Sequence, residues 1–386
     1  MPIFDTYLDT VRQATREISV EQLQQWLATG DVTVVDVREP DEHRAGVIAS
    51  ARLVPRGVLE MRLEMVQPDR DGPVALVCQG GTRSLLAAAT ASLLGYTHVV
   101  SVSGGMDAWA KAGFSTVVPR LLSASQKARY IRQIVMPDIG EAGQQKICDA
   151  RVLCVGAGGL GSPLALYLAA AGVGTLGIID DDVAEASNLQ RQILHNERSL
   201  GIPKVQSARA ALEGLNREVT VRTYEERLTA HNALEIFDEY DIICDGSDNF
   251  PTRYLINDAC VLLGKPNVHG AVYYFDGQTT VFNHGGGPCY RCLYPEPPPA
   301  RLAPNCSQAG VLGSVCGVIG TLQATEVLKL IVGTGVSLAG RLLSCDTLNM
   351  EFRELTIRPN EACPVCSAQP TITTLVDYER LCASTG

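Results

Sequence analysis

The chain has 386 residues, of which 46% are hydrophobic and 19% charged, and its formal net charge is −10. This length predicts two or three domains, and the composition excludes a disordered or collagen-like chain. The acidic balance argues against nucleic acid as the main partner, because binding to phosphates needs a basic face.

The sequence gives little sign of export or membrane insertion. Asp5 and Asp9 stand where a secretion signal needs a basic start and an apolar run. The apolar stretch 310–333 carries Glu326 and Lys329, which favours a buried helix over a membrane span. The chain also has thirteen cysteines. In the reducing cytoplasm, where we expect this protein, clustered cysteines bind metal or catalyse more often than they form disulfides.

Residues 1–118 predict a compact α/β domain. We expect helices at 18–30 and 84–95, and strands at 32–37, 73–78 and 98–105. Strands that alternate with helices indicate a parallel sheet. The pattern loosens over residues 119–126, where we expect a linker. After it, we expect strands and helices to alternate to about residue 356.

A cysteine stands at the junction of an expected strand and helix in this domain. Residues 78–84 are Cys-Gln-Gly-Gly-Thr-Arg-Ser. Backbone N–H groups and the helix N-terminus favour a thiolate at Cys78, and Arg83 adds positive charge. Four residues separate Cys78 from Arg83, whereas cysteine phosphatases place five there. The tighter loop fits one persulfide sulfur better than a phosphate, and an inactive fold with a buried cysteine is the alternative.

This loop resembles the active loop of rhodanese sulfurtransferases. Residues 35–40 (Val-Asp-Val-Arg-Glu-Pro) and 103–109 (Ser-Gly-Gly-Met-Asp-Ala-Trp) resemble the same family. The resemblance covers residues 17–118 and implies that Cys78 carries sulfur as a persulfide. At 46–48 the sequence is Gly-Val-Ile, where the family often has His between Gly and Ile.

A second glycine-rich turn begins after residue 155. It contains Gly156, Gly158, Gly159 and Gly161, and Asp180 ends the next expected strand. Glycines let the backbone approach phosphates, and an acid in this place can bind ribose hydroxyls. This pattern alone fits an NAD dehydrogenase as well as an ATP enzyme.

Later residues separate these two possibilities. Arg191 and Lys204 supply cations, and Asp248 follows another apolar strand. Two cations and a carboxylate suit a triphosphate with Mg²⁺, because the cations bind phosphate oxygens and the acid holds the metal. Hydride transfer needs none of these groups.

Residues 127–368 resemble the MoeB/ThiF family, bacterial relatives of ubiquitin-activating enzymes with a Rossmann-like adenylating domain. The matching strings run from Arg-Tyr-Ile-Arg-Gln-Ile at 129–134 to Cys-Pro-Val-Cys at 363–366, with a tail at 369–386. The resemblance implies that ATP is the substrate and that Arg132 reaches the triphosphate of a partner subunit in a homodimer. It assigns the nucleotide to Asp180, Asn188, Arg191, Gln192, Lys204 and Asn249, and Mg²⁺ to Asp248.

Five further cysteines suggest metal binding or catalysis. Cys289 and Cys292 form one C-x-x-C pair and Cys363 and Cys366 another, which predicts a closed, structural Zn²⁺ site. Two redox C-x-x-C motifs are the alternative. Cys306 follows a proline-rich loop, where a thiol near an acyl adenylate is either a second nucleophile or a merely tolerated residue.

Taken together, the two regions predict that a Cys78 persulfide and an adenylated carboxylate are joined to give a thiocarboxylate. The fusion resembles adenylyltransferase–sulfurtransferases that act on small ubiquitin-like sulfur carriers ending in Gly-Gly, with the domain order reversed. Such carriers serve molybdopterin and thiamine biosynthesis among other pathways. The sulfur donor is either thiosulfate or a cysteine desulfurase.

Three other functions compete with this prediction. An adenylyltransferase that activates a carrier or peptide would have an inactive rhodanese domain, which the intact Cys78 loop disfavours. A standalone sulfurtransferase would have a vestigial nucleotide domain, which Asp248 and Arg191 disfavour. An NAD oxidoreductase would show cofactor absorbance and no ATP–pyrophosphate exchange.

Overall fold

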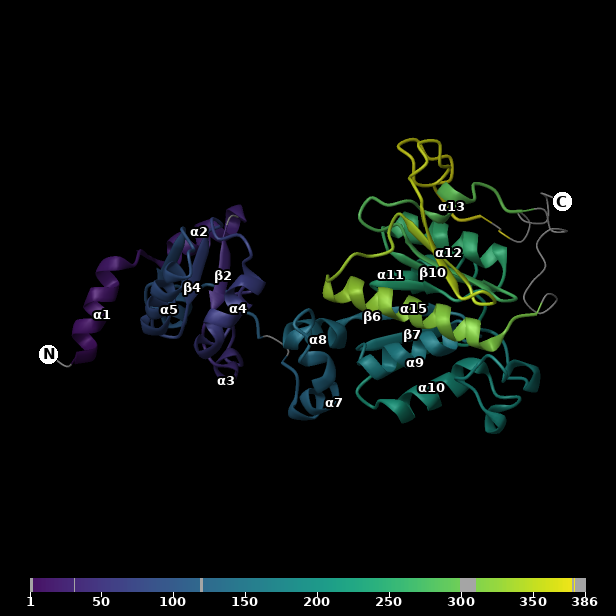
Figure 1. The fold of residues 1–386 in the computed structure, drawn as a ribbon, viewed down its shortest axis with the longest axis horizontal. Coiled ribbons are helices and arrows are strands. Elements are labelled where there is room, and N and C mark those ends of the chain that lie inside the picture. Colours follow the sequence, from purple (N-terminus) through teal and green to yellow (C-terminus); the bar gives the residue numbers. More distant parts are fainter. Residues whose placement is uncertain (1–2, 31, 119–120, 299–309, 377, 379–386) are drawn as a thin grey trace. The chain divides into compact units, whose positions relative to one another are not determined.

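The structure of the chain is a computed structural model that describes residues 3–30, 32–118, 121–298, 310–376 and 378. It divides into two compact units, Met1–Leu121 and Leu122–Gly386 (Figure 1). Residues 124–126, which we expected in a linker, form the first turn of a helix that Ser123 caps.

Unit 1 contains a five-stranded sheet in the order β1-β5-β4-β2-β3, and all of its pairs are parallel, as the alternation predicts. The strands are β1 (Glu17–Ile18), β2 (Thr33–Asp36), β3 (Arg52–Leu53), β4 (Val74–Val77) and β5 (Val99–Val102). The helical segments are α1 (Ile3–Ala14), α2 (Val20–Thr29), α3 (Pro40–His43), η1 (Arg56–Val58), α4 (Leu59–Val66), α5 (Thr82–Leu93) and α6 (Gly105–Lys111).

Local sequence explains these boundaries. Ser19 and Gln22 form a capping box at the start of α2, and Gly30 ends it at a φ of 76°. Strands β4 and β5 are buried at every position, which suits central strands covered on both faces. Two apolar clusters fill the two faces of the sheet, one around Leu59 and Leu76 and the other around Leu23.

Unit 2 contains an eight-stranded sheet in the order β13-β12-β11-β10-β9-β6-β7-β8. Its strands are β6 (Arg151–Val155), β7 (Thr175–Ile179), β8 (Thr220–Tyr224), β9 (Ile242–Asp245), β10 (Asn267–Tyr273), β11 (Asp276–Phe282), β12 (Arg341–Asp346) and β13 (Glu351–Thr356). Its helical segments are α7 (Ala124–Ile134), α8 (Gly140–Asp149), α9 (Gly161–Ala171), η2 (Ala186–Asn188), η3 (Glu197–Ser199), α10 (Lys204–Leu215), α11 (Ala233–Asp238), α12 (Phe250–Leu263), α13 (Tyr290–Leu293) and α15 (Gly313–Val332).

One sequence expectation for unit 2 was wrong. We expected strands and helices to alternate to about residue 356, but β10, β11, β12 and β13 pair antiparallel. Two of these pairs have short connections: Tyr273 pairs with Asp276 across a two-residue turn in which Tyr274 has a φ of 52°, and Asp346 pairs with Glu351 across four residues. Such a turn joins neighbouring antiparallel strands, whereas a parallel crossover needs a dozen or more residues.

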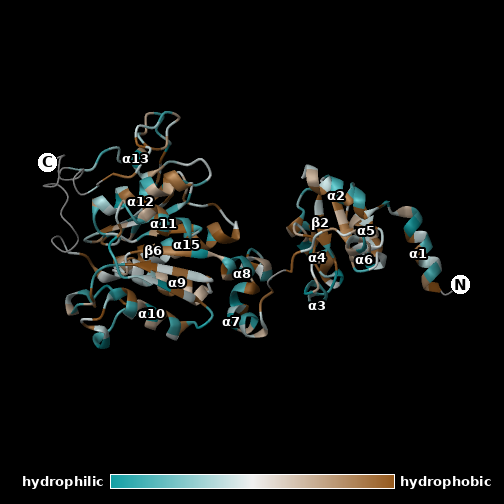
Figure 2. Cartoon of the chain, turned by 180° about the vertical axis from the view of Figure 1, so that it is seen from behind, coloured by the Kyte–Doolittle hydropathy of each residue, from teal (hydrophilic) through white to brown (hydrophobic). Residues whose placement is uncertain are grey.

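Helices cover both faces of the unit 2 sheet (Figure 1). Helices α9 and α15 pack on one face, and α11 and α12 on the other. Figure 2 shows hydrophobic residues on β6 and α9 inside the unit and hydrophilic residues along α10 at its surface. In the described part of the chain α15 alone is long and apolar enough to span a membrane, but half of it is buried within the fold, including Gln323 and Glu326.

Candidate functional site

A cavity of about 390 Å³ lies at the carboxyl ends of β6, β7 and β9. In an open α/β sheet this edge is the usual ligand site. The predicted nucleotide residues that line the cavity are Gly156, Gly158, Gly159, Asp180, Arg191, Gln192, Lys204, Asp248 and Asn249.

The glycine-rich loop is held tightly between β6 and α9. Gly156 adopts a φ of 94°, which favours glycine, and its N–H donates to the carbonyl of Ile179 at 2.9 Å. A Cβ on Gly161 would lie 1.9 Å from the carbonyl oxygen of Gly156. Gly161 therefore does not line the cavity but lets α9 begin directly against the loop.

We predict that Gly161→Ala destabilises unit 2, because backbone atoms that cannot rotate away surround the new methyl group. We expect a loss of about 2 kcal/mol or more, measured as a lower midpoint of urea unfolding. Gly214→Ala in α10 is the matched control, because a Cβ there meets nothing within 4 Å. The control should unfold at the same or a higher urea concentration. Equal midpoints for Gly161→Ala and the wild type would contradict the packing role.

Asp180 and Lys204 face each other on the cavity wall. An Asp180 oxygen accepts the N–H of Ala157 at 2.8 Å, and the Lys204 Nζ atom lies 3.9 Å from the other oxygen. Lys204 also donates to Asp182 at 2.6 Å. Burial raises the pKa of Asp180, and the charge of Lys204 opposes that shift. The buried lysine is thus held among carboxylates beside the glycine-rich loop.

The loop after β9 carries Asp248 into the cavity. Asp248 is exposed, and the Asn249 side-chain amide donates to it at 3.4 Å. Asn249 also caps α12 by accepting the N–H of Thr252. The buried Asp245 anchors this loop, because it accepts the N–H and hydroxyl of Ser247 and a hydrogen bond from His269 at 2.8 Å. Burial would raise the pKa of Asp245, but the His269 hydrogen bond and charge outweigh it and the pKa is lowered.

Further polar residues line the cavity that sequence reasoning did not assign: Asp181, Asp182, Arg227, Ser247 and Arg253. The Asp180–Asp182 carboxylates lie within 4.8 Å of one another. The run of three consecutive acids after β7 was a sequence signal for Asp181 and Asp182. Arg253 stands one turn into α12, and this spacing from Asp248 was a signal for it. Arg227 had no comparable signal, because it follows β8 without a motif.

Two further predicted residues do not line the cavity, and a third is not described. Arg132 is exposed on α7 and does not line the cavity of its own chain. Asn188 does not line the cavity either; its side chain accepts the N–H of Glu185 at 3.3 Å in η2. Cys306 lies outside the described residues.

In unit 1, Cys78 follows β4 and lies before α5, as expected. The side chain is 1% exposed, and its Sγ accepts the N–H of Gly81 at 3.2 Å and lies 3.5 Å from the hydroxyl of Ser84. The first turn of α6 supports it: Met106 donates its N–H to the Cys78 carbonyl at 2.8 Å. A Cβ on Gly105 would lie 2.1 Å from that carbonyl, so the close approach requires glycine.

Arg83 is not a free charge in this structure. Its two terminal nitrogens donate to the two carboxylate oxygens of Glu42 at 2.7 and 2.6 Å. This hydrogen bond lowers the pKa of Glu42 to about 2, although burial opposes the shift. The pair therefore remains ionised at neutral pH, and the Arg83 charge beside Cys78 is largely balanced.

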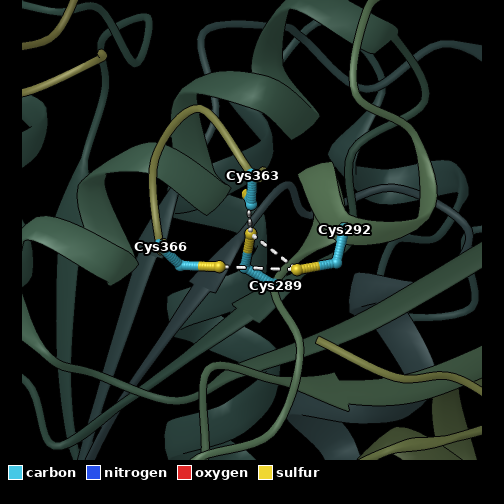
Figure 3. A group of neighbouring side chains, drawn as sticks. All are labelled: Cys289, Cys292, Cys363 and Cys366. Atoms are coloured by element: carbon cyan, nitrogen blue, oxygen red, sulfur yellow. Dashed lines mark hydrogen bonds between the residues drawn. The ribbon is translucent and has the colours of Figure 1, made fainter. Parts of the chain in front are cut away.

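The four cysteines of the two C-x-x-C pairs come together, as Figure 3 shows. The Sγ atom of Cys289 lies 3.9 Å from that of Cys292 and 3.5 Å from that of Cys363, and 3.4 Å separates Cys292 from Cys366. A tetrahedral Zn²⁺ with Zn–S bonds of about 2.3 Å places its sulfurs roughly 3.8 Å apart. Burial and the neighbouring sulfurs raise the pKa of Cys289. The donor set and spacing fit a divalent cation with soft ligands.

Comparison with known proteins agrees with this geometry. The ThiF family profile matches residues 130–365, which is more than half of the chain. The chain belongs to the ThiF family. A rhodanese-like domain profile matches residues 19–112, ahead of the ThiF region. The predicted resemblance to both families, in this order, is confirmed.

Curated relatives of this ThiF-family chain are about half identical to it over the aligned region. The adenylyltransferase and sulfurtransferase MOCS3 of Aedes aegypti is 52% identical over 68% of this chain and 60% of its own length. The sulfur carrier protein adenylyltransferase of Thermus thermophilus is 52% identical over 66% of this chain and 96% of its own length. The match therefore spans about three fifths of the MOCS3 relative and nearly all of the bacterial one.

Solved structures support the fold. The E. coli MccB structure with succinimide superposes with a TM-score of 0.56 at 23% identity, and it covers 62% of this chain and 73% of that chain. A structure of PaaA gives a TM-score of 0.54 at 21% identity, over 66% of this chain and 81% of that chain. Both likenesses concern the fold alone.

Proposed function

We propose that this ThiF-family chain adenylates the C-terminal carboxylate of a small ubiquitin-like sulfur carrier ending in Gly-Gly and then transfers sulfur to it from a Cys78 persulfide. The observation that carries the proposal is the presence in one chain of a cavity lined by a glycine-rich loop, cations and carboxylates, and of a cysteine at a strand–helix junction. The names of the curated relatives support both activities. We assign the transfer to a domain at 1–118 and the adenylation to one at 127–368, joined by 119–126 and followed by a tail at 369–386.

The cavity suits the first step. The carrier carboxylate attacks the α-phosphorus of ATP, a carrier–AMP anhydride forms, and pyrophosphate leaves. Arg191 and Lys204 line the cavity and stabilise negative charge that develops on the phosphates. Gly156, Gly158 and Gly159 let the backbone approach the phosphates, Asp180 binds the ribose, and Gln192 and Asn249 complete the nucleotide pocket.

Asp248 is the residue that would hold Mg²⁺. Its exposed carboxylate stands in the cavity, whereas Asp180 and Asp182 are already engaged with Lys204. Carboxylate oxygens are the ligands that Mg²⁺ prefers. When bound, the ion neutralises charge on the triphosphate.

The second step joins the two activities. The terminal sulfur of the Cys78 persulfide attacks the acyl carbon, AMP leaves, and an acyl disulfide links the carrier to Cys78. A second thiol attacks the Sγ atom of Cys78, so the S–S bond breaks and the carrier leaves as a thiocarboxylate. Cys306 is our candidate for that thiol, and full sulfur transfer by Cys306→Ala would exclude it.

Cys289, Cys292, Cys363 and Cys366 would hold a structural Zn²⁺. A closed set of four thiolates leaves no position for water, so the ion ties α13 to the segment after β13 and takes no part in the reaction. We predict one equivalent of zinc per chain. Cys363→Ser should lose the zinc and lower the melting temperature, whereas Ser367→Ala should do neither. Stoichiometric zinc in the Cys363→Ser protein, measured by atomic emission, would contradict this assignment.

The working unit that we propose is a cytoplasmic homodimer. Ile131 and Val135 are 46% and 63% exposed beside Arg132 on α7, which supports a face that pairs with a second copy. In such a pair Arg132 would reach the triphosphate of the partner. Neither nucleic acid nor a membrane is among the partners that we propose, and the carrier's pathway, such as molybdopterin or thiamine biosynthesis, depends on the carrier.

Carrier-dependent exchange between ATP and pyrophosphate tests the first half of this function. We expect exchange with a Gly-Gly carrier and none with the same carrier lacking its last two residues. Exchange that is independent of any carrier, or none with any carrier, would contradict the proposed adenylation.

A further inference from the structure

The loop around Cys78 in unit 1 would take sulfur from anionic donors, yet the arginines near it are paired with carboxylates. Arg83 is the cation nearest to Cys78 along the loop, and its charge interacts with the sulfur. Both of its terminal nitrogens are occupied by Glu42. The remaining arginine of this region, Arg38, is 1% exposed and paired with the buried Asp36 at 2.7 Å.

Two other carboxylates lie around the loop, those of Asp107 and Glu39. Asp107 is exposed and accepts a hydrogen bond from the neutral side chain of Gln79, directly after Cys78. Its second oxygen lies 3.8 Å from the position of a Cβ on Gly80. Glu39 is also exposed and interacts electrostatically with Arg83. Arg83 thus interacts with Glu42 and Glu39, and Asp107 adds a third carboxylate beside Gln79, so these side chains around Cys78 carry a net negative charge.

We propose that Glu42 is a specificity-determining residue. By pairing with Arg83, Glu42 disfavours dianionic donors such as thiosulfate. It thereby selects a persulfide or thiosulfonate donor whose own cationic group offsets the donor's negative charge. The inference rests on the proposed sulfur transfer at Cys78. Coulomb repulsion grows with the charge of the donor, so a dianion is penalised more than a zwitterion at the same distance.

The chemistry is the same for both kinds of donor. The Cys78 thiolate attacks the outer sulfur of thiosulfate, the S–S bond of the donor breaks, and sulfite leaves with the electron pair. With a thiosulfonate the same bond breaks and a sulfinate leaves. Each reaction leaves a Cys78 persulfide, so donors that differ mainly in net charge can be compared directly.

The test compares thiosulfate with thiotaurine, a zwitterionic thiosulfonate, using cyanide as the acceptor and thiocyanate as the readout. Glu42→Gln removes the charge but keeps an oxygen for the N–H of Glu39, which Glu42 now accepts at 3.0 Å. We expect kcat/KM for thiosulfate to rise roughly tenfold in this variant, and that for thiotaurine to change by less than about threefold. Added salt should speed the reaction with thiosulfate more in the wild type than in Glu42→Gln, because less repulsion remains to be screened in the variant.

Glu60→Gln is the matched control, because it removes the same charge from unit 1 at an ion pair with Arg56. Its donor preference should equal that of the wild type. An unchanged ratio of the two donors in Glu42→Gln, or a wild-type preference for thiosulfate, would overturn the inference. Failure of the wild type with both donors, or equal rates in Cys78→Ala, would instead overturn the proposed sulfur transfer.

Discussion

Asp248→Asn is expected to lower carrier-dependent ATP–pyrophosphate exchange by about 10²–10³-fold. The side chain keeps its shape and its contact with Asn249 but loses the negative charge that would hold Mg²⁺ in the cavity. The fold should persist in this variant, because Asp248 is exposed and the buried hydrogen bonds of the loop are made by Asp245.

Asp238→Asn controls for the loss of one carboxylate. Asp238 is 78% exposed, and its carboxylate lies 3.9 Å from Lys265. This variant should exchange at the wild-type rate. Raising the Mg²⁺ concentration should partly restore Asp248→Asn, and an exchange rate within about twofold of the wild type at low Mg²⁺ would contradict the role of Asp248.

Cys78→Ala is expected to separate the two activities. Formation of the thiocarboxylate should fall by at least about 10³-fold, because no other group in the loop replaces the sulfur nucleophile. Carrier-dependent exchange should stay within about twofold of the wild type, because the cavity lies in unit 2. The exchange assay is therefore the control within the same variant. Loss of both activities would mean that Cys78 serves the fold or the adenylation rather than sulfur transfer.

The features that sequence predicted well are those with local causes. Strands β4 and β7 are short apolar runs bounded by turns, and Gly30 ends α2 by a left-handed conformation that needs no distant partner. The spacing of each C-x-x-C pair likewise indicated a metal site, and the fold brings the two pairs together.

The features that sequence did not predict depend on distant partners. Arg83 was expected to add positive charge at Cys78, but Glu42 of α3, 41 positions earlier in the chain, binds it and largely balances that charge. Gly161 was assigned to the nucleotide, but its neighbour is the carbonyl of Gly156 rather than the cavity. The antiparallel pair β10–β11 was missed because its two-residue turn, Tyr274 and Phe275, carries no glycine signal.

We propose that this chain converts the carboxylate of a carrier into a thiocarboxylate. The intact mass of a Gly-Gly carrier, after incubation with the enzyme, Mg-ATP and a sulfur donor, reports this conversion, and Cys78→Ala is measured alongside. We predict a gain of about 16 Da that requires ATP and Cys78, because one oxygen is replaced by sulfur. An unchanged carrier mass despite carrier-dependent exchange, or the same gain with Cys78→Ala, would contradict it.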